Sequence, residues 1–123
     1  AGHGRPNPPV AALAQAWGTR PSAVASNGEG PVVLATLEAC GLLPLFDTVV
    51  TLDQVAMPKP DPEMFLLAAR RLGHLPAECL VLEDSAQGME AARRAGIPAW
   101  DVRHPEALAR IAAMVSALPA PTA

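Results

Sequence analysis

The chain has 123 residues, of which half are hydrophobic, and a formal net charge of −3. This length suits one domain with a core of its own, and the absence of any cluster of Lys or Arg argues against a nucleic-acid partner. Every apolar run is interrupted by Pro or by a charge before it reaches the roughly 18 residues that a membrane span requires, so we expect no membrane partner.

The cysteine pattern and the first residues bear on the cellular compartment. Cys40 and Cys79 are far apart in the sequence and have no other thiol near them. We interpret them as two buried, reduced thiols rather than as a disulfide or a zinc site. Residues 1–9 contain no apolar segment of the kind that a secretory signal needs. These features predict a cytoplasmic protein.

The first half of the chain alternates helix and strand signals. We interpret residues 1–9, rich in Pro and Gly, as an irregular lead-in to a core domain of residues 10–118, with a frayed tail over 119–123. A helix should begin at Pro9 and end at Gly18. A short strand over 22–25 and a glycine-containing turn over 26–30 follow. The next helix should run from Pro31 to Gly41, with an apolar stripe of Val33, Leu34 and Leu37.

The second half repeats this alternation. β-Branched residues predict a strand over 48–52, and the prolines in 57–62 predict an extended segment before a helix that Asp61 caps and Gly73 ends. A strand over 79–82 leads into a helix that Asp84 should cap, and a strand over 98–102 precedes a helix from Pro105. The pattern predicts an α/β fold, namely a three-layer Rossmann-like parallel sheet with helices on both faces.

Polar residues follow three of the expected strands: Ser26 the first, Lys59 the second, and Glu83 with Asp84 the third. Because the carboxyl ends of parallel strands share one edge of a sheet, these side chains should converge. A hydroxyl beside backbone N–H groups and an ammonium suit a phosphate, and a carboxylate suits Mg²⁺. Each residue alone has a structural interpretation, as a cap, a turn residue or a solvated lysine. Their combination favours a site.

In these segments the sequence resembles the haloacid dehalogenase-like hydrolase superfamily, in its branch of small-molecule phosphatases and β-phosphoglucomutase. The resemblance covers residues 21–102. Val24-Ala25-Ser26-Asn27 is similar to the second motif of the family, and Lys59-Pro60-Asp61-Pro62 to the third. Val81-Leu82-Glu83-Asp84-Ser85, with Gly88, is similar to the fourth.

The resemblance implies phosphoryl transfer from a small phosphorylated metabolite, such as a sugar phosphate, through an aspartyl-phosphate intermediate, with Mg²⁺ as cofactor. The implied phosphate- and substrate-binding residues are Ser26, Asn27, Gly28, Glu29, Gly30 and Lys59, of which Ser26 and Lys59 are implied to be catalytic. The implied metal residues are Asp84 as a ligand and Glu83, which supports or shares that role. Asp53 and Asp61 are interpreted as structural.

One part of the family pattern is missing. The nucleophile of the family lies in an Asp-x-Asp motif after its first strand, and none of the five aspartates here stands in such a motif. The chain therefore resembles the C-terminal part of a longer protein, without the first, central strand and the helical cap domain. Without the nucleophile, we expect the chain alone to be nearly inactive.

A missing central strand would leave two apolar strands with unpaired inner edges. We expect such a chain to be marginally stable, to close these strands directly on one another, or to self-associate through the exposed edges. Two other functions remain open, a phosphoglucomutase-type isomerase and a non-catalytic binding or assembly module. An upstream strand that ends in Asp-x-Asp would favour the enzyme over the module.

Overall fold

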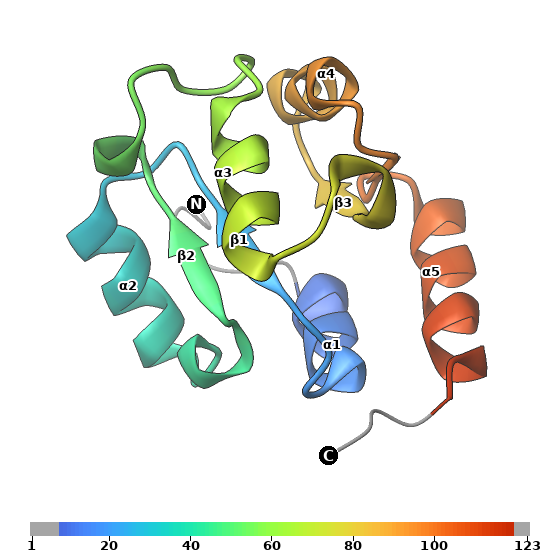
Figure 1. The fold of residues 1–123 in the computed structure, drawn as a ribbon. Coiled ribbons are helices and arrows are strands. Elements are labelled where there is room, and N and C mark those ends of the chain that lie inside the picture. Colours follow the sequence, from blue (N-terminus) through green and yellow to red (C-terminus); the bar gives the residue numbers. More distant parts are fainter. Residues whose placement is uncertain (1–7, 120–123) are drawn as a thin grey trace.

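A computed structural model describes residues 8–119, which alternate helices and strands as expected (Figure 1). The first half contains α1 (Pro8–Trp17), β1 (Ala23–Ala25), α2 (Gly30–Ala39) and β2 (Thr48–Val50). The second half contains α3 (Glu63–Leu72), β3 (Val81–Glu83), α4 (Ala86–Ala95), β4 (Ala99–Asp101) and α5 (Pro105–Ala117). Short 3-10 helices lie at Leu43–Leu45, Leu52–Gln54 and Pro76–Glu78. Most of the expected lead-in and tail lies outside the described residues.

The strands form two parallel pairs rather than one continuous sheet. β1 pairs with β2, from Ala23 opposite Thr48 to Ala25 opposite Val50, and β3 pairs with β4 in the same parallel manner. Within residues 8–119 no ladder joins β1 to β3, so the expectation that these strands close directly on one another is wrong. Side chains join the pairs instead, because Ala25, Phe65 and Val81 belong to one apolar cluster.

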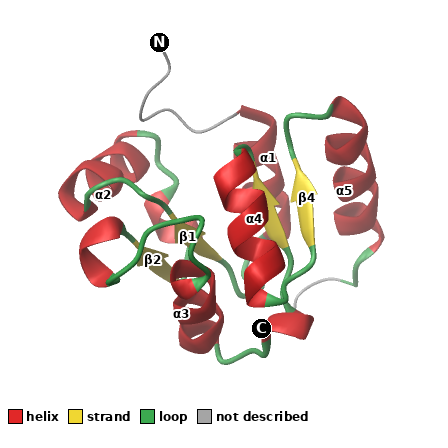
Figure 2. Cartoon of the chain, turned by 90° about the horizontal axis from the view of Figure 1, so that it is seen from above, coloured by secondary structure: helices red, strands yellow, loops and turns green. Residues whose placement is uncertain are grey.

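Helices cover both faces of the strands, which gives the three layers that the sequence predicts (Figure 2). α3 packs on β1 and β2, α4 packs on β3 and β4, and the two helices contact each other. α1 and α5 pack together on the other face of the second pair, through Leu13, Val102 and Ile111. None of the helices in the described part of the chain is long and apolar enough to cross a membrane.

The end of β3 differs from the expectation in one respect that matters for the site. Ser85, not Asp84, is the cap of α4, since the Ser85 hydroxyl accepts the Gly88 N–H at 3.0 Å. The strand continues through Glu83, so the helix begins later than expected. Gly96 ends α4 as expected, with a φ of 74° that an L side chain rarely adopts. The Asp84 carboxylate is therefore not used as a cap.

Two expectations about burial are also wrong. In α2 only Leu37 of the expected stripe is buried, whereas Leu34 is 41% exposed. The helix lies at one end of the fold and packs mainly on the 3-10 turn that follows it (Figure 1). Cys40 is exposed and Cys79 is partly buried, although both are free thiols. An apolar pattern identifies the inward face of a helix but not how much of that face is covered.

We expect the core between α3 and the first strand pair to respond strongly to truncation. Met64 is fully buried beside Val50 and Ala68. Met64→Ala should lower the free energy of unfolding by about 2–5 kcal/mol, because it removes buried atoms and leaves a cavity. Met114 on α5 is 48% exposed, so Met114→Ala should change it by less than about 0.5 kcal/mol. Urea denaturation measures both, and equal losses would contradict this core.

Candidate functional site

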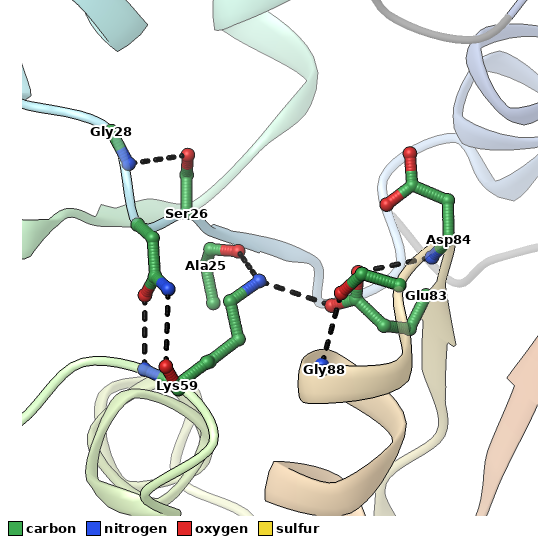
Figure 3. Close-up of polar contacts among 9 residues, drawn as sticks. Ala25, Ser26, Gly28, Lys59, Glu83, Asp84 and Gly88 are labelled. Atoms are coloured by element: carbon green, nitrogen blue, oxygen red, sulfur yellow. Dashed lines mark hydrogen bonds and ion pairs between the residues drawn. The ribbon is translucent and has the colours of Figure 1, made fainter.

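The Lys59 ammonium lies between the two strand pairs (Figure 3). Its Nζ donates to Glu83 Oε2 at the end of β3, at 3.0 Å, and to the Ala25 carbonyl oxygen at the end of β1, at 3.2 Å. The Lys59 and Glu83 side chains are only 10% and 8% exposed, so the ion pair is shielded from water. One cation thus connects the carboxyl ends of two strands that share no backbone ladder.

Both carboxylate oxygens of Glu83 have protein partners. Oε2 accepts from Lys59, while Oε1 accepts the Asp84 N–H at 2.9 Å and the Ser85 hydroxyl at 3.2 Å. α4 also comes very close, since a Cβ at Gly88 would lie 1.9 Å from Glu83 Cδ. Glu83 is therefore fixed in one orientation, and only glycine at position 88 leaves room for it.

The Asp84 carboxylate differs from that of its neighbour. It is exposed, points away from the Lys59–Glu83 pair in Figure 3, and has no hydrogen-bond or ion-pair partner among residues 8–119. The described residues hold no group of three His, Cys, Asp or Glu side chains placed around a metal. The donor set nevertheless fits Mg²⁺ in part, because one free carboxylate with waters and phosphate oxygens is a common form of Mg²⁺ site.

The turn after β1 lies beside the lysine. The Ser26 hydroxyl oxygen accepts the Gly28 N–H at 3.0 Å, which leaves its proton for a ligand. Asn27 binds the backbone of Lys59 at two points, since Oδ1 accepts the Lys59 N–H at 3.0 Å and Nδ2 donates to the Lys59 carbonyl at 3.3 Å. These contacts hold the turn against the proline-rich segment.

The structure thus brings Ser26, Asn27, Lys59 and Glu83 together, with Asp84 at the margin of the group. Glu29 is exposed and makes no capping contact, and the Gly30 N–H is bound by Asp53 rather than free for a ligand. Sequence reasoning missed the tight fit of Gly88. A glycine inside a helix is costly, and this cost is the signal that a close neighbour requires it.

Asp101, at the end of β4, has a partner of its own. Its Oδ2 accepts from Arg103 Nη2 at 2.6 Å and its Oδ1 accepts from Arg103 Nε at 2.9 Å. Hydrogen bonds from Arg103 hold the pKa of Asp101 at about 2, below its ordinary 3.8. Asp101 in turn raises the pKa of Arg103, and the charges of Asp84 and Glu83 add to this effect. Asp101 is therefore occupied in an ion pair beside the site.

Comparisons with known proteins identify the family of the chain. A family model described as haloacid dehalogenase-like hydrolase matches residues 1–96. The fructose-1-phosphate phosphatase YqaB of Escherichia coli is 44% identical over 96 residues, which are 77% of this chain and 51% of that protein. The chain therefore spans about half the length of this relative.

Solved structures show the same similarity. A HAD-family hydrolase from Deinococcus radiodurans, with bound phosphate and sodium, superposes with a TM-score of 0.70 at 31% identity, over 84% of this chain and 50% of that one. A putative β-phosphoglucomutase from Thermotoga maritima gives 0.63 at 36% identity, over 72% of this chain and 44% of that one.

Removal of one partner from the Lys59–Glu83 pair should be costly, because it leaves a buried group uncompensated. Lys59→Met should lower the free energy of unfolding by about 3–5 kcal/mol. Addition of Glu83→Gln should recover part of this loss, since the unpaired charge is then absent. Arg94→Met, which breaks an exposed pair with Glu90, is the control and should change stability little. Urea denaturation measures these free energies. If the double variant loses as much as the two single variants together, the pairing is excluded.

The low pKa of Asp101 makes a separate prediction about acid stability. Because the folded-state pKa lies below the ordinary value, Asp101 stabilises the fold above pH 3.8, and this contribution is lost as pH falls towards about 2. Arg103→Gln should raise the pKa of Asp101 towards 3.8 and weaken that dependence, while the backbone N–H of residue 103 still donates to Asp101 Oδ1. A ¹³C NMR titration of the Asp101 carboxyl group measures the midpoint, and an unchanged midpoint would refute the cause assigned here.

Proposed function

Because the chain belongs to the haloacid dehalogenase-like hydrolases, we propose that it is the phosphate- and metal-binding part of a phosphatase of small phosphorylated metabolites such as sugar phosphates. The position of the Lys59 ammonium carries this proposal, since it lies where the ends of β1 and β3 meet, with Ser26 and Asp84 on either side. The name of the Escherichia coli relative, a fructose-1-phosphate phosphatase, supports the substrate class.

Each residue has a distinct role in this proposal. The Ser26 hydroxyl, whose proton is not engaged by the turn, donates to a phosphoryl oxygen, with the Asn27 amide beside it. Lys59 neutralises the negative charge that grows on the phosphoryl group during transfer. Glu83 keeps the ammonium in place, and because both of its oxygens are engaged, we assign it this supporting role. Asp84 is the carboxylate that is free to ligate Mg²⁺.

Bound Mg²⁺ would supply positive charge beside the phosphoryl oxygens. The nucleophile of the proposed aspartyl-phosphate route is not among the aspartates assigned here, and we propose that a segment outside these 123 residues supplies it. The 123-residue chain alone should then bind phosphate but not hydrolyse a phosphate ester.

We further propose a cytoplasmic location for the protein. We also propose that isolated chains associate through the edges of β1 and β3.

A phosphoglucomutase-type isomerase is the second candidate, favoured by the 36% identity to a putative β-phosphoglucomutase. The two reactions share phosphate, lysine and metal sites. They differ in what accepts the phosphoryl group, which is water in a phosphatase and a sugar hydroxyl in a mutase. Assay of a sugar 1-phosphate separates them, because only the phosphatase releases inorganic phosphate without forming the isomeric ester.

Hydrolysis of an aryl phosphate and of fructose 1-phosphate, by the protein of the complete reading frame that contains this chain, tests the proposal. Lys59→Ala should lower kcat/KM by about 10²–10³-fold, and Asp84→Asn should raise the Mg²⁺ concentration for half-maximal rate by about tenfold or more. Glu90→Gln, which removes a half-buried acid of α4 that pairs with Arg93 and Arg94, is the control and should leave both quantities unchanged. If Lys59→Ala or Asp84→Asn turns over like the wild type, the assigned roles are wrong. If the wild type does not turn over, the binding or assembly module is favoured.

A further inference from the structure

A carboxylate from another segment holds the turn of residues 26–30. Asp53, in the 3-10 helix after β2, accepts the Gly30 N–H at 2.8 Å and the Thr51 hydroxyl at 2.7 Å, both through Oδ1. Gly30 is the first residue of α2, and the cap residue Glu29 makes no side-chain capping bond. The first N–H groups of a helix need acceptors from outside the helix. Asp53 supplies the capping oxygen that Glu29 does not.

The fit around this contact is close. Gly30 is buried, and a Cβ there would lie 2.8 Å from Asp53 Oδ2 and 3.2 Å from Thr51 Oγ1. Thr51 is fully buried, so the hydroxyl that orients Asp53 is itself fixed. The Leu52 N–H also donates to the Gly28 carbonyl oxygen at 3.0 Å. The turn therefore lies along the segment after β2 and is fastened to it at two points.

The charge of Asp53 also affects where an anion can bind. The hydrogen bond from Thr51, then those from the Asp53 and Gly30 backbone, lowers the pKa of Asp53 below 3.8, so the carboxylate is ionised near neutral pH. It occupies the positive end of α2, which would otherwise attract a phosphate. An incoming phosphate thus has donors at Ser26 and Lys59, whereas the first N–H of α2 is already bound by Asp53.

We propose that Asp53 is a positioning residue for the substrate turn: by capping α2 from outside, it holds residues 28–30 against the segment after β2 and presents Ser26 and Asn27 to Lys59. This inference rests on the proposed function. Asp53 itself is exposed and touches no reacting group, so it acts only through the turn.

The chain contains a matched control for this role. Asp47 is also an exposed carboxylate that accepts a backbone N–H from a distant segment, since its Oδ2 lies 2.8 Å from the Ser22 nitrogen. That contact lies at the amino end of β1, away from the site, whereas the Asp53 contact lies beyond the carboxyl end. Substitution of either aspartate removes one such hydrogen bond, but only one of the two holds the substrate turn.

The test compares Asp53→Ala, Asp53→Asn and Asp47→Ala in the protein of the complete reading frame. Asp53→Ala should raise KM and the inhibition constant of inorganic phosphate by about threefold or more. The reason is that loss of the helix cap leaves the turn less ordered, so that it binds phosphate less tightly. Asp53→Asn, which retains a carbonyl oxygen for the Gly30 N–H, should recover most of this loss. Asp47→Ala should leave both constants unchanged while it lowers the melting temperature as Asp53→Ala does.

If the wild type is active and Asp53→Ala has the same KM and the same inhibition constant of phosphate as Asp47→Ala, the positioning role is refuted and the proposed function stands. If the wild type hydrolyses no phosphate ester, the proposed function is wrong and this inference with it. Where Asp53→Ala does not fold, Thr51→Val replaces it, because loss of the hydroxyl frees the Asp53 carboxylate. Thr51→Val should also raise the inhibition constant of phosphate, and an unchanged constant would refute the inference.

Discussion

The ion pair between Lys59 and Glu83 is the interaction on which the site depends. Its atoms lie 3.0 Å apart and are largely shielded from water. Two charges in such a place are costly to desolvate, and an apolar pair of similar volume would often be as stable. The pair is therefore poor evidence for a purely structural role. Its value lies in what it positions, because the same ammonium binds the end of β1, while the Lys59 backbone binds Asn27 in the turn after that strand.

Two neighbouring acids at the end of β3 have opposite roles. Glu83 is the last residue of β3, and Asp84 lies in the bend that follows it. Glu83 points towards Lys59 and α4, where Gly88 makes room for it, and Asp84 points outward without a partner in the described part of the chain. The buried acid, Glu83, therefore holds the lysine, while the exposed acid, Asp84, remains available for a cation. Ser85 makes this division possible, since it caps α4 and frees Asp84 from that task.

Much of this arrangement could be predicted from local sequence signals. Gly73 and Gly96 end their helices as expected. Lys59 meets Glu83 at the end of β3, as the residues at the strand ends predict, whereas Asp84 points away from them. The choice between Asp84 and Ser85 as the cap could not be predicted, because both are good caps and a shift of one residue decides between them. The hydrogen bond between Asp53 and Gly30 joins residues 23 positions apart. It could not be predicted either, because no local sequence pattern indicates such a contact. The separation of the two strand pairs depends on tertiary packing, which local patterns do not encode.

The central claim is that Ser26, Lys59 and Asp84 form one binding site for phosphate and its cation. Titration of the ¹⁵N-labelled 123-residue chain with inorganic phosphate and Mg²⁺, followed by amide chemical shifts, tests it most directly. We predict saturable shifts that are largest at residues 26–28, 59 and 84–85. Saturable shifts confined to another surface, such as the groove lined by Met89, Arg93 and Arg103 between α4 and β4, or no saturable shifts at all, would contradict it.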